Sequence, residues 1–224
     1  MKERIIALIP AYNEAARIGR VVQRTAPHVR QVVVIDDGSS DNTTEVARQA
    51  GAHVIRHLQN RGKGGAILTG LEFFRQSDAE CAILLDADGQ HDPAEIPSFL
   101  ARADATQAGI VVGTRMQDTQ AMPRLRLWTN QFTSWTCSRL ARQRIADSQC
   151  GYRLLRRTVL PDLKFSTSRF ETETEMLIQA GRAGHQIESV PVRTIYEPGR
   201  ASHIRPLRDT VRFFRLVSQY WWRS

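Results

Sequence analysis

The 224-residue sequence has few cysteines and no long apolar run. Its three cysteines, Cys81, Cys137 and Cys150, are odd in number and widely spaced, without a C-x-x-C pair, which excludes a disulfide framework and a zinc site of the usual spacing. A reducing compartment is therefore expected. No stretch approaches the about 20 consecutive apolar residues of a membrane-spanning helix. The apolar run at the N-terminus stops at Pro10, too early for the core of a signal peptide.

Disorder and fibrous repeats are excluded by composition, because 42% of the residues are hydrophobic, 24% are charged, and Gly and Pro number only 14 and 9. The length favours one domain with a sizeable core. Charge is unbalanced, since 31 Lys and Arg against 23 Asp and Glu give a formal net charge of +8. A net positive charge attracts nucleic acid, nucleotides and anionic lipid head groups alike, so the charge alone does not identify the ligand.

Short apolar runs alternate with longer helical patterns through the first half of the chain. The patterns predict strands at 5–9, 31–35, 53–56, 81–85 and 110–113, and helices at 13–26, 41–50, 63–75 and 93–103. These strands are continuous apolar runs, as in a parallel sheet that is covered on both faces. The pattern therefore predicts an open α/β sheet that binds ligands at the carboxyl ends of its strands.

The regular alternation of short strands and helices ends after Gly113. The second half predicts a polar loop at 116–122, helices near 123–140 and 170–180, strands at 150–155 and 186–195, and a last helix from Pro206 onward. Linkers rich in Gly, Ser or Pro do not separate the two halves. We therefore expect one domain over 1–205, followed by an amphipathic helix over 206–224 that is not an independent domain.

The sharpest chemical signal is the stretch ILLDADGQH, where a buried strand ends in Asp86 and Asp88 and Gln90 follows. Residues two apart on an extended chain point to the same side, so both carboxylates can face one point at the strand end. Mg²⁺ or Mn²⁺ takes oxygen ligands of this kind. The alternative is that both aspartates form a turn that caps the next helix; Gly89, Gln90 and the preceding strand favour the metal.

Polar residues also follow the first two strands. Tyr12 could stack on a nucleobase while Asp37 accepts its ring N–H, although Asn13 as a helix cap and a turn at the second strand are the plainer interpretation. A glycine-rich loop at 60–65 opens the next helix, and its backbone N–H groups and Lys63 could hold phosphate oxygens. The loop matches neither a P-loop nor a dinucleotide fingerprint.

Taken together, these residues resemble family-2 glycosyltransferases of the GT-A fold. The likeness is carried by segments 10–14, 36–41, 60–65, 86–91 and 113–115, and it extends to 147–152 and 170–173. It runs in the family's order and spacing from about Arg4 to Asp209. The chain is most similar to the polyprenyl-phosphate sugar synthases, the branch that includes dolichol-phosphate mannose synthases. The resemblance implies a Rossmann-like open, mostly parallel sheet flanked by helices.

The resemblance implies roles for single residues on the donor side. The pocket for the base and ribose is matched by Pro10, Tyr12, Glu14 and Asp37, with Lys63 added for the phosphates. The site for Mg²⁺ or Mn²⁺ and the diphosphate is matched by Asp86, Asp88 and Gln90. A flexible loop that closes over the donor is matched by 199–203. This loop departs from the family, because it is slightly longer and has His203 where many members have lysine.

On the acceptor side, the positions that hold the phosphate are matched by Arg115, Arg126 and Asn130, to which Arg200 and Ser202 of the closing loop are added. Asp147 matches an acidic residue sometimes proposed as a base. A phosphate monoester has a second pKa near ~6, so at neutral pH it needs positioning by arginine rather than deprotonation. Asp147 is then expected to orient an arginine, with a turn cap before Gly151 as the plainer alternative. The candidate catalytic residues are Asp88, Asp147 and Arg115.

These expectations combine into a metal-dependent, inverting transfer of a sugar to a polyprenyl-phosphate or dolichyl-phosphate type of lipid. GDP-mannose and UDP-glucose are the leading donors, ahead of UDP-N-acetylhexosamines. The metal neutralises the departing diphosphate while the acceptor attacks the opposite face of the anomeric carbon. A hydroxyl acceptor on a glycan or glycolipid is the alternative. A haloacid-dehalogenase type of phosphatase is disfavoured by Gln90 and the late D-x-D, and nucleic-acid binding by the lack of a recognisable motif.

The last stretch, PLRDTVRFFRLVSQYWW at 206–222, has apolar residues at helical spacing and arginines on the other side. Such a helix could lie in a membrane interface with its Trp and Tyr at head-group depth, or equally pack on the sheet or on a second subunit. A lipid-phosphate acceptor favours the interface. We therefore predict a peripheral enzyme at the cytoplasmic face of a membrane, with no nucleic-acid partner; the oligomeric state stays open.

Overall fold

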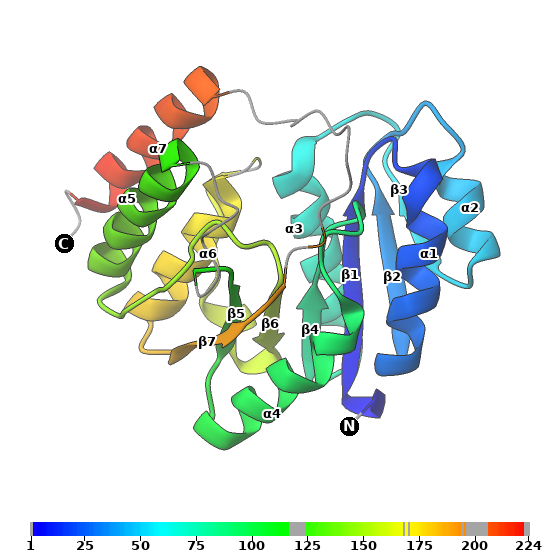
Figure 1. Cartoon of the computed structure of the whole chain (residues 1–224), viewed down its shortest axis with the longest axis horizontal. Coiled ribbons are helices and arrows are strands. Elements are labelled where there is room, and N and C mark those ends of the chain that lie inside the picture. Colours follow the sequence, from blue (N-terminus) through cyan, green and yellow to red (C-terminus); the bar gives the residue numbers. More distant parts are fainter. Residues whose placement is uncertain are drawn as a thin grey trace.

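The computed structural model describes residues 2–116, 124–167, 169, 171–193, 195 and 206–221, with backbone alone at 124–126 and 206–211. Its sheet has the strands β1 Ile5–Ala11, β2 Gln31–Asp36, β3 His53–Arg56, β4 Cys81–Leu84, β5 Ile110–Thr114, β6 Arg153–Arg156 and β7 Ile187–Pro191. They lie in the order β3-β2-β1-β4-β6-β5-β7 (Figure 1). The predicted open α/β sheet is confirmed.

The helices are α1 Ala15–Thr25, α2 Thr43–Gln49, α3 Gly62–Gln76, α4 Ile96–Thr106, α5 Arg124–Ala141, α6 Glu171–Arg182 and α7 Pro206–Trp221. Helix α3 packs against β1 and β2, whereas α4 packs against β5, β6 and β7. Helices α5, α6 and α7 pack on one another and gather on the left of Figure 1. In the part of the chain that the structure describes, no helix is long and apolar enough to cross a membrane.

One strand departs from the parallel pattern that the sequence predicts. Strand β6 runs antiparallel to both β4 and β5, with Arg153 opposite Leu84 on one side and Val112 on the other. Because β6 runs backwards, it begins at the edge where β4 and β5 end. The segment that precedes β6 is thereby placed between the residues that follow β4 and those that follow β5.

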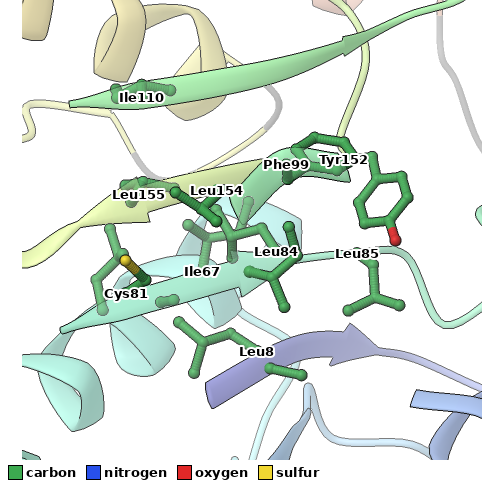
Figure 2. Close-up of a cluster of buried hydrophobic side chains, with 14 of the residues drawn as sticks. Leu8, Ile67, Cys81, Leu84, Leu85, Phe99, Ile110, Tyr152, Leu154 and Leu155 are labelled. Atoms are coloured by element: carbon green, nitrogen blue, oxygen red, sulfur yellow. The ribbon is translucent and has the colours of Figure 1, made fainter. Parts of the chain in front are cut away.

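The core lies on both faces of the central strands, which are continuous apolar runs because neither face meets water. Figure 2 shows Leu8, Leu84 and Leu155 from neighbouring strands packed together with Ile67 of α3. The three cysteines are free and buried. Burial raises the pKa of Cys137 and of Cys150 to about 12, so both thiols stay protonated at neutral pH.

The close approach of α5 and α6 depends on Gly181, and we predict that Gly181→Ala destabilises the protein. A Cβ at this position would lie 2.4 Å from the carbonyl oxygen of Ala141, a backbone atom that cannot turn away. Overpacking of this kind costs about 1–3 kcal/mol, which thermal unfolding would report as a fall of several degrees.

Gly19→Ala is the matched control, since it makes the same substitution inside α1 against a single Val46 methyl at 3.1 Å. It is expected to change stability little or to raise it by about 0.5–1 kcal/mol through helix propensity. Equal melting temperatures for Gly181→Ala and the wild type would contradict the described contact between α5 and α6.

Candidate active site

Among the described residues, the donor-side residues that the sequence predicts lie at the edge of the sheet where β1, β2, β4 and β5 end and β6 begins. The first two loops there are joined to each other. Asn13 accepts a hydrogen bond from the backbone N–H of Ser40 (2.8 Å), and Asp41 accepts one from the backbone N–H of Ala15, at the start of α1 (3.1 Å). The expectation that Asn13 caps α1 is wrong, because its side chain bridges to the second loop and Asp41 takes the capping role.

Asp37 organises the start of the glycine-rich loop. Its buried carboxylate accepts hydrogen bonds from the backbone N–H groups of Arg61 (2.8 Å) and Gly62 (2.7 Å), and it contacts Nδ1 of His57 (2.7 Å). Gly62 has φ +83°, which favours glycine at this turn. These contacts fix where α3 begins; the recognition of a base by Asp37 stays a prediction.

The other residues predicted for the nucleotide pocket differ in exposure. The ring of Tyr12 is 43% exposed and is therefore accessible for stacking. Glu14 is buried, and its carboxylate pairs with Arg17 (3.2 Å). Pro10 lies in β1 opposite Ile35 of β2. At the end of β1, the Tyr12 ring is thus accessible to a ligand, whereas the Glu14 carboxylate is buried and paired.

Behind the D-x-D turn, a salt-bridged cluster joins three elements. Nζ of Lys63, in the first turn of α3, lies 2.7 Å from Oδ1 of Asp86 and 3.2 Å from Oε2 of Glu173 in α6. Burial alone would lower the pKa of Lys63, but the two carboxylates hold that pKa above its ordinary value. Burial would likewise raise the pKa of Asp86, but the Lys63 ammonium holds it well below its usual range. Lys63 and Asp86 are therefore both ionised at neutral pH.

The D-x-D stretch forms a turn, but its aspartates do not cap the next helix, because Asp92 accepts the hydrogen bond from the backbone N–H of Ala94 at that helix's start (3.0 Å). Asp88 accepts a hydrogen bond from the backbone N–H of Gln90 (2.9 Å), and His91 accepts one from the backbone N–H of Asp86 (3.1 Å) while its ring stacks on Tyr152. Among the described residues, no group of three or more His, Cys, Asp or Glu side chains could hold a metal ion. Two carboxylates fit Mg²⁺ or Mn²⁺ nonetheless, since such ions are commonly held by one or two carboxylates plus substrate phosphates.

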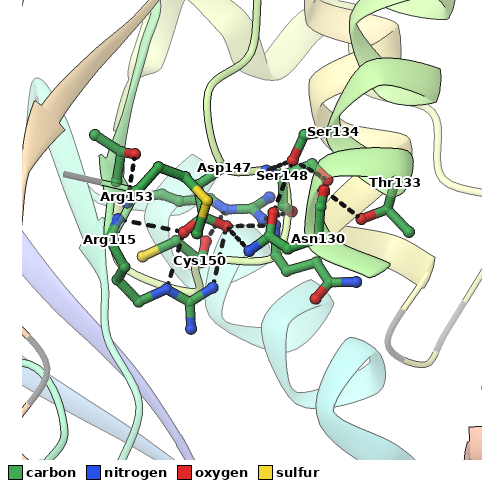
Figure 3. A network of polar contacts seen from close by, with 11 residues as sticks. Arg115, Asn130, Thr133, Ser134, Asp147, Ser148, Cys150 and Arg153 are labelled. Atoms are coloured by element: carbon green, nitrogen blue, oxygen red, sulfur yellow. Dashed lines mark hydrogen bonds and ion pairs between the residues drawn. The ribbon is translucent and has the colours of Figure 1, made fainter. Parts of the chain in front are cut away.

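A second polar network surrounds Asp147, which is fully buried in the segment before β6 (Figure 3). Nε and Nη2 of Arg115 donate to its two oxygens at 2.9 and 3.0 Å, and Nδ2 of Asn130 donates at 2.9 Å. Burial alone would raise the pKa of Asp147, but the hydrogen bonds and charge of Arg115 lower it below its usual value. An ionised carboxylate held in this way supports the hypothesis that Asp147 orients an arginine.

The structure brings together only part of the predicted acceptor set. Asn130 is buried and directed at Asp147, and its amide oxygen accepts a hydrogen bond from Ser134 (3.0 Å). It therefore supports Asp147 rather than facing an open site. Arg126 lies in α5 one turn before Asn130, but its side chain, like Arg200, Ser202 and His203, lies outside the described residues.

Sequence reasoning did not single out two residues that hold the site together. Glu173 pairs with Lys63, and the segment that contains it was noted only as part of the family likeness. The fully buried guanidinium of Arg153 donates to the backbone carbonyl oxygens of Ser148 (2.7 Å), Cys150 (2.7 Å) and Glu173. An arginine within an apolar strand was the signal that could have revealed it.

Comparison with known proteins identifies the family, because residues 6–163 match the model of glycosyl transferase family 2. The chain is a member of this family. A UDP-N-acetylglucosamine–dolichyl-phosphate N-acetylglucosaminyltransferase from Methanococcus voltae is 32% identical over 215 residues, covering 86% of each chain. An undecaprenyl-phosphate mannosyltransferase from Micrococcus luteus is 28% identical over 205 residues, covering 84% of this chain and 82% of the relative.

The fold of the glycosyltransferase is also found among solved structures. Glucosyl-3-phosphoglycerate synthase from Mycobacterium tuberculosis superposes with a TM-score of 0.71 at 21% identity, covering 97% of this chain and 78% of that one. The resemblance to GT-A glycosyltransferases is thereby confirmed for the fold and for the family. The chain is a glycosyltransferase with relatives that are named for polyprenyl-phosphate acceptors.

We predict that Asp147→Asn destabilises this glycosyltransferase in a pH-dependent way. Removing one partner of a buried ion pair costs about 3 kcal/mol. Because the pKa of Asp147 is lower in the folded protein than its unfolded value of about 3.9, its contribution is present above that value and is lost as the pH falls through the folded pKa. Urea unfolding should therefore show a wild-type advantage at pH 7 that shrinks at acidic pH.

Asp162→Asn serves as the control, since Asp162 is half exposed in its pair with His185 and should contribute little at pH 7. A difference between the wild type and Asp147→Asn that stays constant down to about pH 3 would contradict the lowered pKa, because it would mean that Asp147 binds protons equally in the folded and the unfolded protein.

Proposed function

We propose that this glycosyltransferase moves a sugar, with inversion and with Mg²⁺ or Mn²⁺, from a nucleoside diphosphate sugar to the phosphate of a polyprenyl lipid. One observation carries the proposal: the cluster around Asp86 and the network around Asp147 meet at a single edge. A Cβ on Gly151 would lie 3.0 Å from both the Asp86 carboxylate and the Lys63 ammonium. The segment that holds Asp147 therefore also lies against the D-x-D cluster.

On the donor side, Asp86 and Asp88 would hold the metal, with Gln90 beside them and Tyr12 available to stack on the base. When bound, the metal would neutralise the charge of the departing diphosphate. The Mycobacterium tuberculosis synthase has been solved with Mn²⁺ and UDP-glucose, and the Methanococcus voltae relative is named for UDP-N-acetylglucosamine. These descriptions support a nucleotide sugar, with UDP-N-acetylglucosamine beside GDP-mannose and UDP-glucose as donors to test.

On the acceptor side, Asp147 holds the Arg115 guanidinium in one plane through two parallel hydrogen bonds. A rigid guanidinium suits the positioning of a phosphate. An acceptor phosphate that is already ionised at neutral pH does not need a base, and the lowered pKa of Asp147 agrees with a residue that binds and orients. A hydroxyl acceptor would need a base, so this geometry favours the phosphate.

The surface that would meet a membrane is formed by two helices. We call Trp128, Phe132 and Trp135 of α5 and Phe214 of α7 the aromatic ridge. All four are exposed, and the Phe132 ring lies 6.1–6.5 Å from each of the other three. Exposed aromatic side chains on a chain with net charge +8 fit an anionic bilayer surface. Asn130, on the same helix as three of them, is directed inward at Asp147.

Helix α7 packs on α5 and α6 of the same chain, whereas its place in a membrane interface stays a prediction. Leu216 is buried, and Tyr220, expected at head-group depth, instead contacts Gln179 (2.8 Å) and Glu175 (3.2 Å) of α6. Trp221 is exposed. We propose a peripheral enzyme at the cytoplasmic face that meets the membrane through the aromatic ridge, with α7 as one part of it.

Asp88→Asn is predicted to lower transfer by about 10²–10³-fold, because a charged group at the metal and diphosphate would be removed. Release of UDP or GDP from the matching sugar nucleotides, with Mn²⁺ and a short-chain polyprenyl phosphate, measures the effect. Asp78→Asn is the control, since Asp78 is strongly exposed and pairs with Arg30 on the surface. Turnover by Asp88→Asn near the wild-type rate would contradict the metal assignment.

Replacing both Trp128 and Trp135 by Ser is predicted to reduce flotation with anionic liposomes by about tenfold, because interfacial aromatic burial is lost. Binding of the nucleotide sugar should not change. Leu58→Ser is the control, as Leu58 is fully exposed but lies after β3, outside the ridge. Unchanged flotation of the double variant would show that the ridge does not face the membrane.

A further inference from the structure

The ammonium of Lys63 is paired with Oδ1 of Asp86, one of the carboxylate oxygens that would bind the metal. Its Nζ lies 2.7 Å from Oδ1 of Asp86 and 3.2 Å from Oε2 of Glu173. The three side chains are 22%, 27% and 11% exposed, respectively, so the cluster is shielded but reachable from the edge of the sheet. In this state the charge of Asp86 is already neutralised by the protein itself.

A divalent cation would compete with this ammonium for Asp86. Mg²⁺ binds carboxylate oxygens at about 2.0–2.1 Å, so two cations would share one carboxylate at short range and repel each other in a partly shielded site. The backbone at Gly151 closes one side of the pair, because a Cβ there would lie 3.0 Å from both groups. Neither group can withdraw in that direction, so the ammonium has to leave Asp86 toward another partner.

Two partners lie within reach of such a movement. Glu173 already contacts Lys63, and its backbone carbonyl is held by Arg153, so it stays in place as an anchor. The other is the diphosphate of a donor, because Lys63 is in the first turn of α3, whose N-terminal N–H groups favour an anion. The long flexible side chain of lysine permits a change of partner without movement of the backbone.

We propose that Lys63 is an exchangeable counter-ion, which neutralises Asp86 in the nucleotide-free enzyme and moves to the donor diphosphate, still anchored by Glu173, when the metal binds Asp86. The inference rests on the proposed function, since it takes the metal and the nucleotide as ligands. Metal and nucleotide then assist each other's binding through Lys63. Without nucleotide, Mn²⁺ binds weakly, because it must displace the Lys63 ammonium from Asp86 while no diphosphate is present to receive that ammonium.

Titration of Mn²⁺, followed by the electron paramagnetic resonance signal of the free ion, tests this directly and does not depend on turnover. The full chain is titrated alone and with UDP or GDP. Lys63→Met is expected to bind Mn²⁺ about tenfold more tightly than the wild type without nucleotide, and the enhancement by nucleotide is expected to fall by about tenfold, within the usual range of coupling between sites. Lys63→Gln repeats the measurement if Lys63→Met unfolds.

Arg48→Met is the matched control, because it removes the same charge from an exposed position in the last turn of α2, outside the site. Both its Mn²⁺ affinity and its enhancement by nucleotide should stay close to wild type. The inference is overturned if Lys63→Met binds Mn²⁺ no more tightly than the wild type. It is also overturned if the Mn²⁺ affinity of Lys63→Met rises by the same factor with and without nucleotide, as the simple loss of a positive charge would require. Failure of the wild type to bind Mn²⁺ even with UDP or GDP would instead overturn the proposed function.

Discussion

Arg153 lies in β6, between β4 and β5, and its guanidinium is buried without solvent exposure and donates to carbonyl oxygens on two separate segments. Ser148 and Cys150 belong to the stretch that carries Asp147, whereas Glu173 lies in the first turn of α6 and contacts Lys63. A buried charge is tolerated only when its donors are satisfied. The stretch before β6 and the start of α6 are therefore held in one geometry, on which the positions of Asp147, Gly151 and Glu173 depend.

The site is built from paired charges although the chain as a whole is strongly cationic. Lys63 is paired with Asp86 and Glu173, and Arg115 is paired with Asp147. Pairing limits the cost of burying these groups before a ligand arrives. Under the proposed exchange at Lys63, binding of an anionic donor would replace one partner of the lysine by another, whereas Arg115 would keep Asp147 as its partner.

Helix α5 links the chemistry to the surface, because its two faces have different environments. Asn130 and Ser134 point inward and support Asp147, whereas Trp128, Phe132 and Trp135 are exposed. The helical repeat places these two sets on opposite sides of one rigid rod. The aromatic ridge and the network that holds Arg115 thus lie on opposite sides of α5.

Local patterns were sufficient to predict the strands and helices, the D-x-D turn and the glycine-rich loop, since each depends on residues close together in the sequence. The family followed from the resemblance of several such segments in their order and spacing. That Asp147 orients an arginine was also predicted, from the chemistry of a phosphate acceptor, whereas the structure identified its partner as Arg115. Tertiary structure alone decided that β6 runs antiparallel, that Lys63 pairs with Asp86 and Glu173, and that Asn130 turns inward. These features depend on the register between strands and on which segments meet at the sheet edge, which no local periodicity encodes.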